Sequence, residues 1–516
     1  MNAPRTRREF LTAVGQGMLV AGVGAGLASD LGLSPAFADE GAEALSFGAL
    51  DPLVALMQET SIERLLPTLV ERINSGTELK TLLAAGALAN ARSFGGEDYI
   101  GYHTMMALSP AYQMSRELSG QRQALPILKV LYRNTNRIQE HGGRKTEVLH
   151  PVKPGQLSPG ENGAEALQNA VRAADLDRSE RTFAALAQGD AREAFDQLLY
   201  SVQDDTAVHR VVLPYRAWEL LGLIGYEHAH TMLRQSVRFC VKERPRGEVV
   251  GQMLPKVLDQ HKLAGRTPGD RAADDAWIDQ MSQTLFNATP AQAADAAAAA
   301  LAEGFSPDAL REAISLAANQ LVLRDIGRIA QHESPGKPIG SVHGDSVGVH
   351  ACDSANAWCN MAKVGSPRNV FACLILGAYQ VAQDRENGRG DFLHWDPLPI
   401  EQNWNRVTAS EPQPLLKELD TAIRGNLQHR ACRVVQQYGK LGHDPRPVFD
   451  LMLGYATSED GSLHAEKYYR TASQEFAQTR PAFRWRQMIA LARVTASEYG
   501  RPAPGSAEAR ELLKIT

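Results

Sequence analysis

The sequence predicts an all-α protein that is built from many helices. Ala and Leu are abundant while aromatic residues make up only 6% of the chain, a composition that favours helix. Apolar residues recur at three- and four-residue spacing through most of the chain, which is the periodicity of amphipathic helices. Neither alternating strand patterns nor a βαβ order is evident. We therefore expect helical hairpins packed around a shared core.

The periodic segments predict the following helices in chain order: residues 50–74, 78–92, 104–118, 124–140, 163–174, 178–188, 190–202, 208–221, 226–241, 291–302, 308–324, 367–383, 415–438, 446–455, 462–478, 481–499 and 507–515. Proline and glycine indicate a long surface loop over residues 145–162. Residues 242–271 are polar and interrupted by proline, and residues 387–404 are irregular. These three stretches should connect helical blocks.

The length of 516 residues, with 44% hydrophobic residues, is enough for a large core. Length alone suggests two to four domains, and a repetitive interior would instead allow a single large one. We divide the chain into a leader (residues 1–38), an N-terminal helical half (39–290) and a C-terminal helical half (291–516), and the two halves could form one continuous domain.

Charge and cysteine content narrow the class of protein. The formal charge is −5 with a pI near 6.3, and the basic runs are short, which argues against a nucleic-acid or anionic-membrane partner. The five cysteines form no CxxC or CxxCH motif. We therefore expect no disulfide framework, no thiolate zinc finger and no c-type haem attachment.

The first forty residues match a twin-arginine export signal. Arg7 and Arg8 precede a large apolar residue, a weakly hydrophobic stretch follows at 13–28, and residues 36–38 (AFA) supply a cleavage site before Asp39. The alternative is an amphipathic helix with a chance arginine pair. The apolar run is too short and glycine-rich for stable membrane insertion. The leader predicts a periplasmic or secreted bacterial protein that is a partner of the twin-arginine machinery, which exports folded and often cofactor-loaded proteins.

Four segments of the chain resemble one another. They begin GYH, AVH, GVH and SLH, and their histidines are His103, His209, His350 and His464. In the first three an aromatic residue follows about two turns later, namely Tyr112, Trp218 and Trp358. Each segment precedes another apolar helix. One supersecondary unit used four times would place each histidine at the N-terminal end of an inner helix. If the units close around an axis, the four imidazoles converge on a central pocket.

Converging imidazoles would suit a transition metal such as Fe, Zn, Cu or Mn. The candidate ligands are His103, His209, His343, His350 and His464. Asp345 could orient a ring or transfer a proton, and His228 is a further catalytic candidate. The three aromatic residues Tyr112, Trp218 and Trp358 would wall an apolar pocket that holds a small-molecule substrate. The simpler interpretation is that each histidine caps a helix or satisfies a hydrogen bond in the core.

Other catalytic templates have less support. The chain has no HExxH, no Walker loop and no GxGxxG. Residues 344–348 (GDSVG) spell GxSxG around Ser346, but that motif needs a preceding strand, and none is expected here.

The helices that begin with histidine, together with the Val349-His350-Ala351 and Ser354-Ala355 run, resemble the questin oxidase family of helical proteins. This resemblance implies oxidative opening of aromatic ketones, and it favours redox chemistry. The sequence therefore predicts an exported, metal-dependent enzyme of oxidoreductase type. Two alternatives remain open: a non-catalytic helical-repeat binding protein, and a metal-free hydrolase that uses His343 or His350 as a general base.

Overall fold

The computed structural model describes residues 44–243, 245, 249–334, 338–342, 346–387, 392–400 and 407–515. Of these, Ser46 onward belong to one compact unit that extends to Thr516. The protein is 72% helical, and the described residues form 22 α-helices and no strand, which confirms the all-α expectation.

The N-terminal half of the chain contributes these α-helices: α3 (Asp51–Glu59), α4 (Ile62–Asn74), α5 (Leu79–Phe94), α6 (Tyr99–Glu117), α7 (Ala124–Glu140), α8 (Gly163–Arg172), α9 (Leu176–Leu186), α10 (Ala191–Val202), α11 (Val208–Ile224), α12 (Ala229–Lys242), α13 (Val249–Gln260) and α14 (Asp275–Asn287). Short 3-10 turns lie between some of them, including η4 (Tyr226–His228).

The C-terminal half contributes α15 (Pro290–Ala302), α16 (Pro307–Arg324), α17 (Val347–Val364), α18 (Pro367–Asn387), α19 (Pro412–Arg424), α20 (Gln428–Lys440), α21 (Arg446–Ser458), α22 (His464–Gln478), α23 (Trp485–Glu498) and α24 (Ser506–Leu512). No helix among the described residues has both the length and the apolar character needed to cross a membrane.

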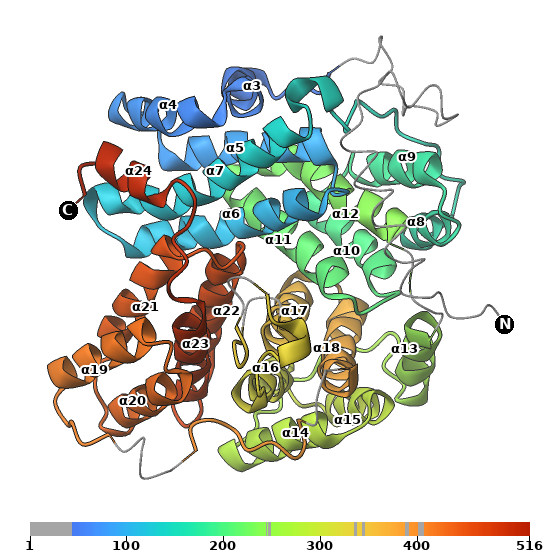
Figure 1. The fold of residues 1–516 in the computed structure, drawn as a ribbon. Helices are drawn as coiled ribbons and strands as arrows, with labels where there is room; N and C mark the ends of the chain where they lie inside the picture. The colour runs from blue at the N-terminus through green and yellow to red at the C-terminus, as the bar shows by residue number, and fades with distance from the viewer. Residues whose placement is uncertain are drawn as a thin grey trace. The chain divides into compact units, whose positions relative to one another are not determined.

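Four inner helices organise the fold. α6, α11, α17 and α22 contact one another in chain order, and α22 returns to α6, so they close a ring. Figure 1 shows α6 and α11 above α22 and α17 near the middle of the view. Each inner helix also packs against the helix that follows it, α7, α12, α18 or α23. The inner helices are buried on most sides, as expected for helices with little amphipathic character.

Two glycines allow the inner helices to approach their neighbours, and each lies two residues before a histidine. A Cβ on Gly348 would lie 2.5 Å from the backbone nitrogen of Val322 in α16. A Cβ on Gly101 would lie 2.5 Å from the ring of Phe94 at the end of α5. Any side chain at these positions would push the first turn of α17 or α6 outward, because backbone and ring atoms cannot yield.

Several predicted boundaries were wrong for local reasons. The helix predicted at 50–74 breaks at Thr60, and the one at 415–438 breaks at Asn426, which has a left-handed φ of 52°. α6 begins at Tyr99, five residues earlier than predicted, because the Asp98 carboxylate accepts the Gly101 N–H at 2.7 Å and caps the helix. The sequence did not predict α13 or α14. In α13 a proline lies inside the helix and interrupts its apolar periodicity.

Candidate metal centre

Four histidines lie in the first turns of the four inner helices. His103 is the fifth residue of α6, His209 the second of α11, His350 the fourth of α17 and His464 the first of α22. The first turns of these four helices lie close together in the fold. Imidazoles from segments more than a hundred residues apart in the chain therefore come into contact.

The rings form two close pairs. The Nε2 atoms of His103 and His209 are 3.1 Å apart, and those of His350 and His464 are 3.3 Å apart. The pairs also face each other: the ring centroids of His103 and His464 are 5.3 Å apart, and those of His209 and His350 are 6.0 Å apart. The four imidazoles therefore form one cluster, which we call the four-histidine cluster.

These distances resemble those around a tetrahedral metal ion. Metal–nitrogen bonds of 2.0–2.1 Å place two Nε2 ligands about 3.3 Å apart and their ring centroids about 5 Å apart. As placed, however, no group of three or more His, Cys, Asp or Glu side chains among the described residues meets the geometry of a metal site. Within each pair, the distance between the two Nε2 atoms suits two ligands of one ion. The two pairs would have to move closer together for all four imidazoles to bind the same ion.

The tautomer of His103 suits a ligand. Its Nδ1 lies 2.6 Å from the carbonyl oxygen of Tyr99, so the Nδ1–H donates there and the Nε2 lone pair is directed into the cluster. Hydrogen bonding of the far ring nitrogen to a carbonyl is the usual way in which proteins orient histidine ligands.

The cluster is buried on one side and accessible on the other. His103 and His464 are 4% and 5% exposed, whereas His209 and His350 are partly exposed. The rings of Tyr99 and Tyr102 pack against His103, at centroid distances of 4.4 and 5.0 Å. Tyr99 is itself 60% exposed, so it covers the histidines at the protein surface.

Three of the four histidines, His103, His209 and His464, are held neutral. Burial, followed by the positive charge of Lys467, lowers the pKa of His209 to about 3. The same two causes, in the same order, lower the pKa of His103 and of His464 below the ordinary value. Neutral imidazoles have the free lone pair that metal binding or proton acceptance requires.

A buried polar layer lies one to two turns below the cluster, and sequence reasoning missed it. Burial lowers the pKa of Lys467 to about 8, while Asp353 opposes that shift. Burial raises the pKa of Asp353, whose Oδ1 accepts a hydrogen bond of 2.8 Å from the Thr471 hydroxyl. Lys467 follows His464 by three residues and Asp353 follows His350 by three, so each shares a helical face with its histidine. This three-residue spacing was the feature of the sequence that could have identified the two residues.

The remaining predicted ligand and catalytic residues are His343, Asp345 and His228. His343 and Asp345 lie outside the described residues. His228 ends η4, beyond the C-terminal end of α11 and about 22 Å of helix from His209. Its ring instead packs edge-on against Phe47 at 6.1 Å.

The three predicted pocket aromatics lie elsewhere in the core. They follow their histidines by eight or nine residues, about 12–14 Å along the helix. Trp358 is fully buried and donates its indole N–H to Gln380 in α18 at 2.7 Å. Trp218 stacks on Phe195 of α10 at 4.7 Å, and Tyr112 is partly buried in the last third of α6. The three aromatic residues therefore lie more than two turns away from the histidines of their own helices, and their role in lining a pocket stays a prediction.

Ser346 and the cysteines have structural roles. Ser346 is the N-cap of α17, where its hydroxyl accepts the Val349 N–H at 3.3 Å. No strand precedes it among the described residues, so the GxSxG pattern is not a nucleophile elbow here. All five cysteines are free and buried.

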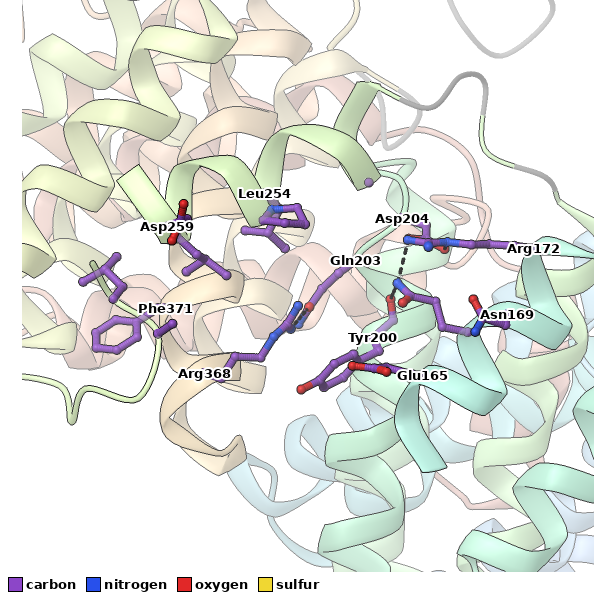
Figure 2. A pocket seen from close by; sticks show the side chains of 16 residues that line it. Glu165, Asn169, Arg172, Tyr200, Gln203, Asp204, Leu254, Asp259, Arg368 and Phe371 are labelled. Carbon is purple, nitrogen blue, oxygen red and sulfur yellow. Dashed lines mark hydrogen bonds and ion pairs between the residues drawn. The ribbon is translucent and has the colours of Figure 1, made fainter. Parts of the chain in front are cut away.

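A separate hollow of about 480 Å³ lies between α8, α10, α13 and α18 (Figure 2). Two of its arginines are already held by other groups of the hollow. Arg172 forms a two-point contact with Asp204, at 2.9 and 2.6 Å. Arg368 lies 4.0 Å above the ring of Tyr200 and donates to neighbouring amide oxygens. These contacts occupy both arginines of the hollow.

Comparisons of this chain with family models, with curated proteins and with solved structures gave no match.

Proposed function

We propose that the four-histidine cluster binds one transition-metal ion and that the protein is an exported, metal-dependent enzyme of oxidoreductase type. The observation that carries the proposal is the pairing of Nε2 atoms at 3.1 and 3.3 Å, from four helices that converge at one end. Two neutral imidazoles 3 Å apart gain one hydrogen bond at most, whereas a shared ion would satisfy all four lone pairs.

The choice of redox chemistry has two supports. Imidazole ligands suit Fe, Cu, Zn and Mn, and three of these change oxidation state in proteins. The resemblance to questin oxidases and the twin-arginine leader, which commonly exports cofactor-loaded proteins, both favour an oxidoreductase. A bound ion would supply the redox or Lewis-acid chemistry. Lys467 and Asp353, packed beneath the histidines, would hold and move a proton at that point.

Metal analysis tests the proposal. We would purify the exported protein and measure Fe, Cu, Zn and Mn by elemental analysis, beside a His103→Ala/His350→Ala variant that removes one ring from each pair. The matched control is His261→Ala/His443→Ala, because those rings lie outside the cluster and contact Asp295 and the Ser410 carbonyl. We expect about one ion in the wild type and in the control, and none in the cluster variant. No metal in any of them would overturn the proposal.

Export has its own test. Arg7 and Arg8 belong to residues 1–43, which lie outside the described residues. Replacing both with Lys should leave the protein in the cytoplasm, since the twin-arginine machinery reads the arginine pair. Unchanged export of the Lys pair would contradict this part of the proposal and would leave the metal site unaffected.

A second candidate is a metal-free general base, favoured by the hydrogen-bond distance of the His103–His209 pair. In the orientation that Tyr99 imposes, His103 Nε2 accepts a proton, and His209 is its donor. This candidate predicts that activity on a substrate persists after complete chelation but is lost in His103→Ala.

A further inference from the structure

A cavity of about 960 Å³ lies beside the end of α16 and the start of α20. Residues 394–400 border it on one side, and Arg493 of α23 borders it on another. This volume is in the range of small-molecule sites, which are usually concave and partly apolar.

Exposed apolar side chains gather at this cavity. Ile326, Ile339 and Leu427 all line it and are 50%, 58% and 53% exposed. They are three of the ten large apolar side chains exposed among the described residues. Trp395 and Leu398 add further apolar surface. An exposed apolar patch that is concentrated in a hollow indicates a binding surface, because scattered exposure would be ordinary.

Two arginines give the cavity positive charge. Arg324 donates to the Trp395 carbonyl at 2.7 Å, and Arg493 donates to the carbonyls of Val322 and Asp325. These hydrogen-bond partners are neutral oxygens, whereas the carboxylate of Asp396 acts on Arg324 and that of Asp325 acts on Arg493. Three arginines against these two aspartates line the cavity, because Arg430 also borders it, so the lining keeps an excess of positive charge. Burial raises the pKa of the Asp325 carboxyl.

The cavity continues towards the four-histidine cluster. A smaller hollow of about 230 Å³ shares Asp325, Ile326 and Trp395 with it and extends to Ser346 and Val347 at the start of α17. Ser346 precedes His350 by four residues, so the two lie on the same face of the helix. The two hollows together form a groove that runs to the face of α17 bearing His350.

We propose that this groove binds the substrate, and that the substrate is an organic anion with an aromatic or other apolar body. Ile326, Ile339, Leu427 and Trp395 contact the apolar body, and the guanidinium groups of Arg324 and Arg493 attract the anionic group. The role of the bound molecule as a substrate rests on the proposed function, whereas its binding does not.

Two fluorescent probes that differ by one sulfonate test the chemistry. We would titrate the metal-free full-length protein with 8-anilinonaphthalene-1-sulfonate and with uncharged N-phenyl-1-naphthylamine. We expect one site for the anionic probe, with at least tenfold tighter binding than the uncharged probe. Equal binding of the two probes, or many weak sites, would overturn the proposal, because the arginines would then contribute nothing.

One helix offers a matched pair of variants for locating the site. Leu427 and Leu441 flank α20 at its two ends, and both are exposed, but only Leu427 lines the cavity. Leu427→Glu should weaken the anionic probe at least tenfold, while Leu441→Glu should change its affinity by less than twofold. Similar effects of both substitutions would place the probe elsewhere and contradict the proposal. Circular dichroism would confirm that both variants remain helical.

The proposal of a substrate groove and the proposal of a metal site can be tested independently. Binding of the anionic probe to His103→Ala/His350→Ala should match that of the wild type, because these histidines do not line the cavity. Normal probe binding without any metal in the wild type would leave the groove as a binding site and remove the metalloenzyme. Metal without probe binding would retain the metal centre and overturn the groove.

Discussion

The four-histidine cluster and the hollow in Figure 2 are both rich in polar groups, yet they differ in what those groups already bind. In the hollow, Arg172 and Asp204 neutralise each other at 2.6 Å, and Arg368 is held against Tyr200. In the cluster, four imidazoles turn their Nε2 atoms towards one another and share hydrogen bonds that can satisfy only some of them.

This difference shows that a large volume is weaker evidence for a site than ligand-type atoms from separate helices that face one another at 3.1 and 3.3 Å. The hollow has about 480 Å³ of space, but its charges stabilise the contact of α8 with the end of α10. The cluster depends on neutral rings that burial and Lys467 keep unprotonated. Four predictions test the contrast, in order of expected effect.

The largest effect should be stabilisation by metal at the cluster alone. A ligand that binds only the folded state stabilises it by about 4 kcal/mol when its free concentration is a thousand times Kd. We expect added Zn²⁺ to raise the Tm of the wild type and of Arg368→Ala, and to leave that of His103→Ala/His350→Ala unchanged. Differential scanning fluorimetry measures this. An equal shift in all three would indicate non-specific binding.

A smaller effect should follow from breaking the pair in the hollow. Asp204→Asn removes the carboxylate from its contact with Arg172, whose side chain is 46% exposed. Because solvent screens this contact, the loss should cost about 1 kcal/mol of unfolding free energy. Metal content should stay at the wild-type value, because the hollow takes no part in ligation. Urea unfolding and elemental analysis provide the two readouts. Loss of metal in this variant would refute the separation of the two regions.

The third effect in order of size is the dependence of the unfolding free energy of the metal-free protein on pH. The pKa of His209 is lowered to about 3, whereas an unfolded histidine titrates near 6.5. Below pH 6.5 the unfolded chain therefore binds a proton that the folded chain does not, and stability falls as the pH falls towards 3.

His209→Gln removes that titration. It should reduce the slope of unfolding free energy against pH between 6.5 and 5 by about 0.5–1 kcal/mol per unit, below the ceiling of about 1.4 because the ring is partly exposed. Urea unfolding at several pH values measures the slope. Identical slopes for the wild type and the variant would show that His209 is not held neutral.

The smallest effect should come from Tyr99→Ala. The backbone carbonyl of Tyr99, and not its ring, accepts the His103 Nδ1–H. The substitution should therefore uncover the histidines while retaining the tautomer, with metal affinity changed by less than about threefold. Competition with a chromophoric chelator measures the affinity. A loss comparable to that of a histidine variant would show that the ring itself holds His103 in place.

The sequence alone predicted the helical class and the positions of most helices, because apolar spacing is local and survives without tertiary information. It also singled out His103, His209, His350 and His464 as equivalent positions, since each comes two residues after a small residue at the start of a periodic segment. It did not indicate the capping by Asp98 that lengthens α6, or the helix that contains Pro255.

Tertiary structure decided which of the candidate residues meet. The aromatics Tyr112, Trp218 and Trp358 shared the pattern of the histidines, but helical rise separates them from the cluster by more than two turns. Lys467 and Asp353 each follow a histidine of the cluster by three residues, but this spacing alone does not show that the two side chains lie together. They became part of the site only because α17 and α22 lie side by side in a closed ring of four helices. Sequence spacing fixes neighbours along one helix, whereas contact between helices depends on how their buried faces pack.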